Sequence, residues 1–469
     1  MIRDITKEDI SIIYSLGKQY DTDFKKHYIL EDYLNNDIYL LKCYEIDSKV
    51  VGFLIATKME DNIDLLFIFV DKNNRKEGIA SNLIDSLWQC GVSTITLEVS
   101  KDNKEALPLY KKIGFKEINV RKGYYHGIDG IVMQKEKDIY ILSIETSCDE
   151  TSIAIVKNGH ECIALTILTQ MDTHAKFGGV VPEIASRMHT ENITMVLEET
   201  LNKAGMKVSE MDAIAVAYKP GLLGSLLVGV EFAKVLSYVY DKPLIGVNHL
   251  IGHIYANNLE DNLEYPLLAL VISGGHTELA IMHDDYDFEM LGTTMDDAIG
   301  EAFDKVARVI GYPYPGGPNI EKAAIVGKYT YELSKPVLDD TYNFSYSGLK
   351  SQVINLVNTE KMKGNQIRKE DLAYSFQKIA VDELERKLSL ALKNTGIKRV
   401  VIAGGVSANK YLQGRLDSVC NKFNAKLYIP RLLYCTDNGA MIGAAAYPLY
   451  LKKEFKDLSL NAESHSDLI

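Results

Sequence analysis

Residues 267–281 read Leu-Leu-Ala-Leu-Val-Ile-Ser-Gly-Gly-His-Thr-Glu-Leu-Ala-Ile: an apolar strand, a glycine turn and a second apolar strand. The turn, residues 273–277, lets the backbone approach a phosphate or an acyl group closely, because glycine carries no side chain. A related pattern occurs earlier, where residues 139–156 form two apolar strands around a turn of hydroxyl and acidic side chains. These two units predict a duplicated α/β fold that holds a nucleotide between its halves.

The segment Asn-His-Leu-Ile-Gly-His-Ile-Tyr-Ala, residues 248–256, places His249 and His253 four residues apart. On a helix this spacing puts both imidazoles on one face, where they can share a metal ion. With 10 histidines in the chain, such a pair also arises by chance as two capped or solvated side chains. An isolated acidic turn at Asp437 and a glycine-rich strand end at residues 400–409 accompany the pair. Together these features indicate one nucleotide-and-metal cleft.

Composition limits the class of protein. With 469 residues and 46% hydrophobic residues, the chain has the length of about two to four domains with packed cores. No uninterrupted apolar run reaches the ~18 residues of a membrane span, and the first residues lack the apolar region of a signal peptide. We therefore expect a cytoplasmic protein without a membrane partner.

Cysteine spacing and charge exclude further classes. The six cysteines include no CxxC pair, which argues against a disulfide framework and against a thiolate zinc site. The net charge of −12 opposes nonspecific binding of nucleic acid. A local basic patch can still hold a folded RNA, so a tRNA partner remains open.

The first 134 residues have the pattern of a small α/β domain. An apolar strand, residues 64–70, leads into a turn with Gly78 and Ala80 that opens a helix. The free N–H groups at such a helix start can hold a pyrophosphate, although a single glycine turn is more often only a turn. A second strand, residues 94–99, precedes Asn103 and the segment Leu-Tyr-Lys-Lys-Ile-Gly-Phe at residues 109–115.

Because they contain the motif Arg75-x-x-Gly-x-Ala80, Asn103 and the segment at 109–115, residues 1–134 resemble the GNAT acetyltransferases. It is most similar to the RimI-type enzymes, which acetylate the N-terminal amine of a ribosomal protein. The resemblance implies a GNAT fold over residues 1–134, acetyl-CoA as co-substrate and ribosomal protein S18 as acceptor. It also implies that Glu98 is the general base and that Tyr110 protonates the departing CoA thiolate. A strand carboxylate on a solvated face and a packed core tyrosine are the structural alternatives.

The same resemblance assigns the binding of acetyl-CoA to the strand end and to the loop that follows it. Ala80 stands where that family often has glycine. The residues expected to hold the cofactor are Ile68, Phe69, Val70, Lys76, Glu77, Gly78, Ile79, Ala80, Ser81 and Asn103.

A charged run, Lys-Glu-Lys-Asp at residues 135–138, separates two strand-like stretches. It is too short to act as a flexible tether. We expect a short linker there and a second domain over residues 139–469. That second region carries an ordered series of glycine-containing motifs at residues 177–189, 218–229, 300–305, 314–318 and 344–350.

Because these motifs follow one another in this order, residues 139–469 resemble the TsaD family, the tRNA threonylcarbamoyladenosine transferases. The resemblance implies a duplicated actin-like ATPase (ASKHA) fold. It implies transfer of a threonylcarbamoyl group from threonylcarbamoyl-AMP, which an upstream synthase makes. The acceptor is N6 of adenosine 37 in tRNAs that read codons beginning with A, and the modified nucleoside is called t6A. It also implies TsaB-like and TsaE-like partner proteins.

Carried over residue by residue, the metal positions of the family fall on His249, His253 and Asp437, which would hold one Fe²⁺ or Zn²⁺ per chain. Two imidazoles and a carboxylate leave coordination positions open, so a bound ion can orient the carbamate and stabilise charge on its carbonyl oxygen. The positions expected to bind the adenylate are Val271, Ile272, Ser273, Gly274, Gly275, Asp304, Gly317, Glu321 and Asn409.

Three of these side chains, Asp304, Glu321 and Asn409, are predicted to bond ribose hydroxyls or adenine edges. Helix capping is the alternative for Asp304 and Asn409. Two positions depart from the family pattern: Ile251 occupies a site that is often acidic, and Lys219 stands where a glycine often precedes Pro-Gly.

The sequence leaves two alternative functions. A metal-dependent glycoprotein endopeptidase would need the general base of a His-Glu-x-x-His motif, but here Leu250 follows His249, so the water-activating carboxylate is missing. A nucleotide-gated binding scaffold with an inactive GNAT domain would bind its ligands without turnover.

Overall fold

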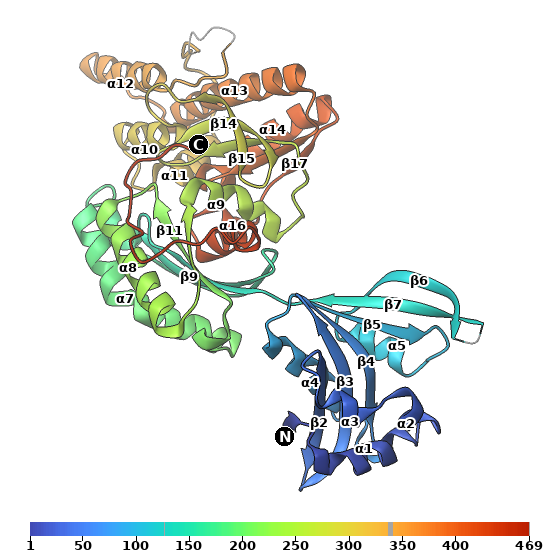
Figure 1. The fold of residues 1–469 in the computed structure, drawn as a ribbon. Coiled ribbons are helices and arrows are strands. Elements are labelled where there is room, and N and C mark those ends of the chain that lie inside the picture. The colour runs from blue at the N-terminus through green and yellow to red at the C-terminus, as the bar shows by residue number, and fades with distance from the viewer. Residues whose placement is uncertain (126, 336–340, 469) are drawn as a thin grey trace. The chain divides into compact units, whose positions relative to one another are not determined.

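The computed structural model describes residues 1–125, 127–335 and 341–468. The contacts within it divide the chain into two units, Met1–Asp138 and Ile139–Ile469 (Figure 1). Strand β7 (Ile128–Glu136) includes two of the four residues predicted as a linker, because Lys135 pairs with Ile95 and Glu136 with Thr94. Only Lys137, Asp138 and Ile139 separate β7 from β8, the first strand of the second unit.

The first unit is built on one mixed sheet in the order β1-β2-β3-β4-β5-β7-β6. Alternate residues of its strands point to opposite faces, as β5 shows with buried side chains at every second position. The strands besides β7 are β1 (Ile2–Asp4), β2 (Tyr39–Ile46), β3 (Lys49–Met59), β4 (Asn62–Val70), β5 (Thr94–Ser100) and β6 (Lys116–Tyr125).

Helices cover both faces of this sheet. Residues of α1 (Ile10–Gly17), α2 (Phe24–His27) and α3 (Leu30–Tyr33) pack with Phe53 and Ile55 of β3 in one hydrophobic cluster. Residues of α4 (Ile79–Asp85) and α5 (Ala106–Lys112) pack with Leu54 and Ala56 in another. Because consecutive residues of β3 enter different clusters, the sheet is a central layer with a core on each side.

Strands β4 and β5 are parallel, and their paired residues end at Leu65 and Leu97 although both strands continue beyond that point. Leu66 is an extra residue in β4, because Leu65 pairs with Ala56 and Phe67 pairs with Ile55. A bulge of this kind bends its strand. It therefore accounts for the separation of the carboxyl ends of β4 and β5.

The second unit contains two sheets with one topology. The first has the order β10-β9-β8-β11-β12 and the second the order β15-β14-β13-β16-β17. In each sheet, three antiparallel strands joined by hairpins are extended by two parallel strands. The strands are β8 (Tyr140–Glu145), β9 (Glu150–Lys157), β10 (Glu161–Thr169), β11 (Ala213–Lys219), β12 (Leu244–Asn248), β13 (Leu267–Ile272), β14 (Thr277–Asp284), β15 (Asp287–Thr293), β16 (Arg399–Ala403) and β17 (Lys426–Tyr428).

Helices fill the space between the two sheets and cover their outer faces (Figure 1). Between the sheets, α9 (His249–Tyr255) and α16 (Gly439–Leu451) pack against strands of both halves in one core. Helices α7 (Pro182–Ala204) and α8 (Leu223–Tyr240) cover the first sheet. The second sheet is covered by α10 (Ile299–Ile310), α11 (Gly316–Ala324), α12 (Ser347–Met362), α13 (Lys369–Thr395) and α14 (Lys410–Lys422). Two further short helices of the unit are α6 (Met171–Ala175) and α15 (Leu432–Cys435).

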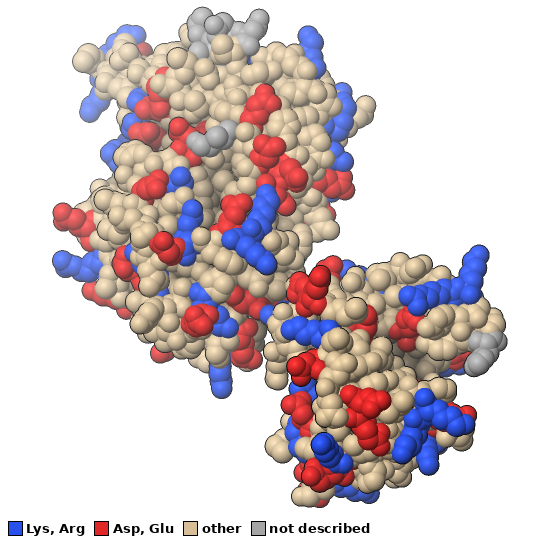
Figure 2. All heavy atoms as spheres, in the orientation of Figure 1, with Lys and Arg blue, Asp and Glu red and all other residues tan. Residues whose placement is uncertain are grey.

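Among the described helices, α8 alone has the length and apolar composition that would let it cross a bilayer. It packs on α7 and β11, and 39% of it is buried within the structure. The core helix of a globular unit meets the same criteria of length and composition. Figure 2 shows acidic and basic side chains interspersed on the face in view.

Candidate functional site

Helix α9 begins where β12 ends. Asn248 caps the helix, since its side-chain oxygen accepts a hydrogen bond from the N–H of Leu250 at 2.8 Å. The helix then presents His249 and His253 on one face, with ring centroids 4.6 Å apart and planes at 80°. Both imidazoles are buried between the two halves of the second unit.

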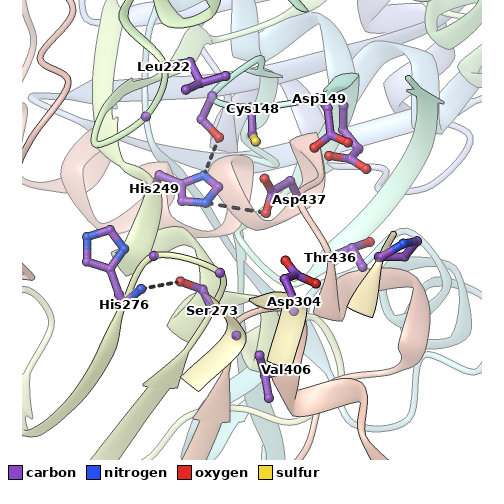
Figure 3. A pocket seen from close by; sticks show the side chains of 18 of the residues that line it. Cys148, Asp149, Leu222, His249, Ser273, His276, Asp304, Val406, Thr436 and Asp437 are labelled. Carbon is purple, nitrogen blue, oxygen red and sulfur yellow. Dashed lines mark hydrogen bonds and ion pairs between the residues drawn. The ribbon is translucent and has the colours of Figure 1, made fainter. Parts of the chain in front are cut away.

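Asp437 lies just before α16, a helix capped by Asn438 through the N–H of Met441 at 3.0 Å. The Oδ1 atom of Asp437 is 3.5 Å from Nε2 of His249 and 3.2 Å from Nε2 of His253. One ligand atom from each of the three residues lies within 4.8 Å of the others. The structure therefore brings together the three predicted ligands, and Figure 3 shows His249 directed toward Asp437.

The donor set fits a metal ion. Neither ring nitrogen of His253 has a well-formed hydrogen bond with a described residue, although this side chain is buried. Buried polar atoms nearly always have a partner, so Nε2, which lies 3.2 Å from Asp437 without a well-formed hydrogen bond, has the position of a metal ligand. Ligand atoms about 2 Å from a tetrahedral ion lie roughly 3.3 Å from one another, which matches the separations of 3.2 and 3.5 Å from Asp437.

The charges also favour a cation. Burial opposes protonation of His249, but the charges of Glu145 and Asp437 outweigh it and raise its pKa to about 9. Burial lowers the pKa of His253. For Asp437, burial raises the pKa, but the two imidazoles outweigh this effect and hold it at about 2. The site thus keeps an ionised carboxylate and draws a positive charge toward its centre.

A cavity of about 810 Å³ opens beside the metal triad, which we define as His249, His253 and Asp437. Its lining comes from both halves of the unit and includes the turn after β8, the loop before α8 and the turn after β13 (Figure 3). A cavity of this size accommodates a nucleotide-sized ligand. Of the residues predicted to bind substrate or metal, those that line it are His249, Ser273, Gly274, Gly275, Asp304, Gly317, Glu321, Asn409 and Asp437.

Two predicted substrate residues lie elsewhere. Val271 and Ile272 are buried in β13, and their side chains belong to the hydrophobic clusters on the two faces of the second sheet. A sheet covered on both faces buries consecutive residues of its strands, so neither side chain lines the cavity, and the expected role of these two positions in adenylate binding stays a prediction. The lining from this segment begins at Ser273.

The glycine turn at residues 273–276 is closed by two hydrogen bonds. The N–H of Ser273 donates to the carbonyl of His276 at 2.9 Å, and the N–H of His276 donates to Oγ of Ser273 at 3.1 Å. A Cβ added at Gly274 or Gly275 would meet nothing within 4 Å, which leaves that backbone open to a ligand. Close packing requires glycine instead at Gly300 in α10, where a Cβ would lie 2.5 Å from the carbonyl oxygen of Ser273.

Three predicted ligand-binding side chains already have partners within the protein. Oδ1 of Asp304 accepts from the N–H of Gly316 at 2.6 Å, and burial raises the pKa of this carboxyl. Oε1 of Glu321 accepts from the N–H of Lys410 at 2.6 Å.

Asn409 caps α14. Its Oδ1 accepts from Leu412 at 2.9 Å, and its Nδ2 donates to Gln377 at 3.0 Å. The helix-cap alternative therefore describes Asn409, because both ends of its amide are engaged.

The sequence pattern points to the acidic turn, residues 146–149, but the predicted binding residues include none from it and neither of its two flanking residues, Glu145 and Glu150. Cys148, Asp149 and Glu150 line the cavity. Burial, followed by the charges of Asp437 and Asp149, raises the pKa of Glu150 to about 10. The signal was present in the sequence as hydroxyl and acidic residues between two apolar strands, a pattern that an ordinary polar turn shares.

In the first unit, Glu98 and Tyr110 lie on β5 and α5. The Glu98 carboxylate forms an ion pair with Arg121 of β6 at 2.7 Å. Tyr110 is 7% exposed and packs edge-on against Phe115, with ring centroids 5.7 Å apart. Burial raises the pKa of Tyr110 to about 12, which keeps its hydroxyl protonated at neutral pH.

The predicted cofactor residues surround the diverging ends of β4 and β5. Ile68, Phe69 and Val70 end β4, and the turn from Lys76 to Ser81 leads into α4. Gly78 has φ +80°, a conformation that favours glycine and places it at the start of the helix. Oδ1 of Asn103 accepts from the N–H of Ala106 and so holds the start of α5, while its contact with the cofactor stays a prediction.

Comparison with known proteins adds two family matches. Residues 161–444 match the family described as TsaD, tRNA N6-adenosine threonylcarbamoyltransferase. Residues 2–137 match the family described as acetyltransferase (GNAT) domain.

Individual relatives cover either the second or the first unit. The tRNA N6-adenosine threonylcarbamoyltransferase of Staphylococcus aureus (strain Newman) is 50% identical over 333 residues, which are 71% of this chain and 98% of that protein. The protein of the same name from Staphylococcus haemolyticus (strain JCSC1435) is 50% identical over 333 residues, 71% of this chain and 97% of its own. The crystal structure of the ribosomal-protein-S18-alanine N-acetyltransferase from Escherichia coli is 25% identical, covers 29% of this chain and 92% of that chain, and has a TM-score of 0.26.

Proposed function

We propose that residues 139–469 modify adenosine 37 in tRNAs that read codons beginning with A. This chain belongs to the TsaD family of tRNA N6-adenosine threonylcarbamoyltransferases, and that membership supports the proposal. The donor is threonylcarbamoyl-AMP supplied by an upstream synthase. The two equivalent sheets support a duplicated actin-like ATPase fold for this region. The observation that carries the proposal is the metal triad at the edge of a nucleotide-sized cavity lined by the turns of both halves.

The reaction is an acyl transfer. The N6 amine of the adenosine attacks the carbamoyl carbon of the donor and a C–N bond forms. The C–O bond to the phosphate breaks, N6 releases one proton to solvent, and AMP leaves. Negative charge develops on the carbonyl oxygen during the attack. The open backbone at Gly274 and Gly275 offers N–H groups for that charge or for the leaving phosphate.

A metal ion would be held by Nε2 of His249, Nε2 of His253 and a carboxylate oxygen of Asp437. An Fe²⁺ or Zn²⁺ ion bound there acts as a Lewis acid with open coordination positions. The chain's own residues orient the donor: Ser273, Gly274 and Gly275 face its acyl or phosphate group, and Asp304, Gly317 and Glu321 line the space for the nucleoside. Asn409 contributes to this wall through the start of α14 rather than through its engaged amide.

The experiment that tests this function is the modification of tRNA in vitro. The purified chain is combined with a threonylcarbamoyl-AMP synthase, TsaB-like and TsaE-like partner proteins, ATP, threonine, bicarbonate and tRNA, and the nucleosides are analysed by mass spectrometry. We expect t6A with the wild-type chain. Formation of threonylcarbamoyl-AMP without any t6A would contradict the proposal.

For the first unit, we infer acetyl transfer from acetyl-CoA to a protein N-terminus, with ribosomal protein S18 as the acceptor. The GNAT family match and the diverging ends of β4 and β5 support this activity. Glu98 would accept a proton from the incoming ammonium. Tyr110, which stays protonated, would donate one to the CoA thiolate.

The acetyltransferase proposal is tested with an S18 N-terminal peptide, acetyl-CoA and mass spectrometry. We expect Tyr110→Phe to lower acetylation by about 10²-fold, the usual contribution of a general acid. The tRNA modification measured on the same preparation should not change. An acetylation rate equal to that of the wild type would remove Tyr110 from the mechanism.

A tRNA and a ribosomal protein as substrates place both proposed activities in the cytoplasm. Membership in the TsaD family supports the TsaB-like and TsaE-like partners as components of the first reaction.

A further inference from the structure

Glu145 is a fully buried carboxylate at the end of β8, with 0% side-chain exposure. Its Oε2 atom lies 2.9 Å from Nδ1 of His249, and its Oε1 atom accepts a hydrogen bond from the N–H of Ser147 at 2.5 Å. It does not belong to the metal triad, and the proposed reaction gives it no role.

A carboxylate is buried at a large cost in free energy unless charged or hydrogen-bonding partners compensate it. Here one oxygen is used by a backbone N–H and the other by an imidazole. An ionised carboxylate can only accept hydrogen bonds. The ring nitrogen that faces Glu145 must therefore carry a proton.

The two nitrogens of His249 consequently have different surroundings. Nδ1 faces Glu145 and Ser147, whereas Nε2 faces Asp437 at 3.5 Å. Figure 3 shows the ring between the acidic turn and Asp437. With its proton held on Nδ1, the neutral ring offers its lone pair at Nε2, on the side of the metal triad.

We propose that Glu145 is a positioning residue for the metal centre: it holds the ring of His249 in one orientation and one tautomer, with Nε2 as the metal-binding atom. This inference rests on the proposed function, because it requires a metal ion in the triad. A histidine ligand commonly donates its second ring N–H to a carboxylate in this way, and loss of such a carboxylate costs about 10–100-fold in metal affinity.

The other histidine of the metal triad, His253, has different surroundings from those of His249. Nδ1 of His253 is buried and has no hydrogen-bond partner among the described residues. Only one of the two imidazoles is therefore fixed by a carboxylate. Replacement of Glu145 should act on His249 alone and leave the position of His253 on α9 unchanged.

The variant Glu145→Gln tests the proposal because an amide cannot satisfy both contacts. If its oxygen accepts from Ser147, its NH₂ group faces Nδ1 of His249 and requires that atom to be an acceptor, which moves the ring proton to Nε2 and blocks the metal. If the amide is flipped, its NH₂ group meets the N–H of Ser147. Either arrangement disfavours the metal-binding state of His249.

We would measure the dissociation constant for Zn²⁺ of the full chain by competition with a chromophoric chelator. We expect the Glu145→Gln protein to bind Zn²⁺ about 10–100-fold more weakly than the wild type. A matched control is Glu278→Gln, which replaces another buried carboxylate, 1% exposed on β14, without contact to the triad. The control should keep the wild-type affinity, and the thermal unfolding of both variants shows whether each is folded.

A second readout is the proton NMR spectrum of the Zn²⁺-loaded chain. A ring N–H held by a carboxylate gives a strongly downfield signal, which we expect in the wild type and in Glu278→Gln. It should be absent from Glu145→Gln and from His249→Ala. This signal reports the hydrogen bond itself, so a merely structural role for Glu145 would not remove it from a folded variant.

The outcomes separate this inference from the proposed function. If the wild-type chain fails to bind Zn²⁺ or Fe²⁺, the metal centre of the proposed function is wrong. If the wild type binds the ion and folded Glu145→Gln binds it equally well, the metal centre stands and the positioning role of Glu145 is refuted.

Discussion

The two halves of the second unit use the same strand-turn-strand element for opposite chemistry. Between β8 and β9, the carboxylates of Asp149 in the acidic turn and of Glu150 beside it line the cavity that also contains Asp437, and Glu145 contacts His249. Between β13 and β14, the glycine turn offers open backbone and no acid. One scaffold thus gives a cavity with two different walls, and in the proposed transfer from an acyl phosphate they would act as a cation-binding wall and an anion-binding wall.

The largest effect should follow from removal of the cation-binding wall. We expect His249→Ala to abolish binding of the metal and to lower t6A formation by on the order of 10³-fold, since a Lewis acid supplies several kcal/mol of transition-state stabilisation. Metal content is measured by atomic emission and t6A by nucleoside mass spectrometry. Acetylation of the S18 peptide by the same preparation is the control, and its loss would contradict two separate active sites.

Displacement of the glycine turn should have a smaller effect that spares the metal. In Gly300→Ala, the new Cβ would press on Ser273 and Gly274, whose nearest backbone atoms lie 2.5 and 2.8 Å away. A misplacement of about 1 Å costs roughly 10²-fold, so we expect a loss of about 10–100-fold in kcat/KM for t6A formation with unchanged Zn²⁺ affinity. Gly414→Ala is the matched control, because nothing lies within 4 Å of its Cβ.

The corresponding change behind the acidic turn should affect both properties. In Gly221→Ala the new Cβ would lie 2.6 Å from the carbonyl oxygen of Ser147, a residue that also contacts His249. We expect about a tenfold loss both in Zn²⁺ affinity and in t6A formation, because a displaced acidic turn no longer supports His249. If this variant spared the metal while Gly300→Ala lost it, the assignment of the two walls would be reversed.

The smallest expected effect is the pH dependence of Zn²⁺ binding at the cation-binding wall. The pKa of His249 is raised to about 9, so the imidazole is protonated at neutral pH and the metal must displace one proton. The apparent Zn²⁺ affinity should rise about tenfold per pH unit from pH 7 and level off near pH 9. His253, whose pKa is lowered, adds no proton in this range. Chelator competition at several pH values measures the slope, and a flat profile would contradict this account.

Much of this arrangement was predictable because local patterns encode local structure. Strand-turn-strand signals located both hairpins, and the spacing of four residues put His249 and His253 on one helical face. The structure brings Asp437 to them, an approach that the sequence indicates only through family resemblance.

What the sequence could not supply depends on burial and on distant contacts. Glu145 looks like an ordinary strand-end acid until β12 and α9 bring His249 against it. Asn409 resembles a ligand-binding amide, but its bonds cap α14. The first two residues of the predicted linker, Lys135 and Glu136, pair with β5, because strand pairing outweighs the charge of a short run at the edge of a domain.

The central claim is that two imidazoles and one carboxylate hold a single metal ion beside the nucleotide cavity. Anomalous diffraction from crystals of the chain, collected on both sides of the iron and zinc absorption edges, tests it most directly. We predict one peak per chain, within coordination distance of His249, His253 and Asp437. A chain that crystallises with its metal bound at other residues, or that shows no peak after loading with either ion, would contradict the claim.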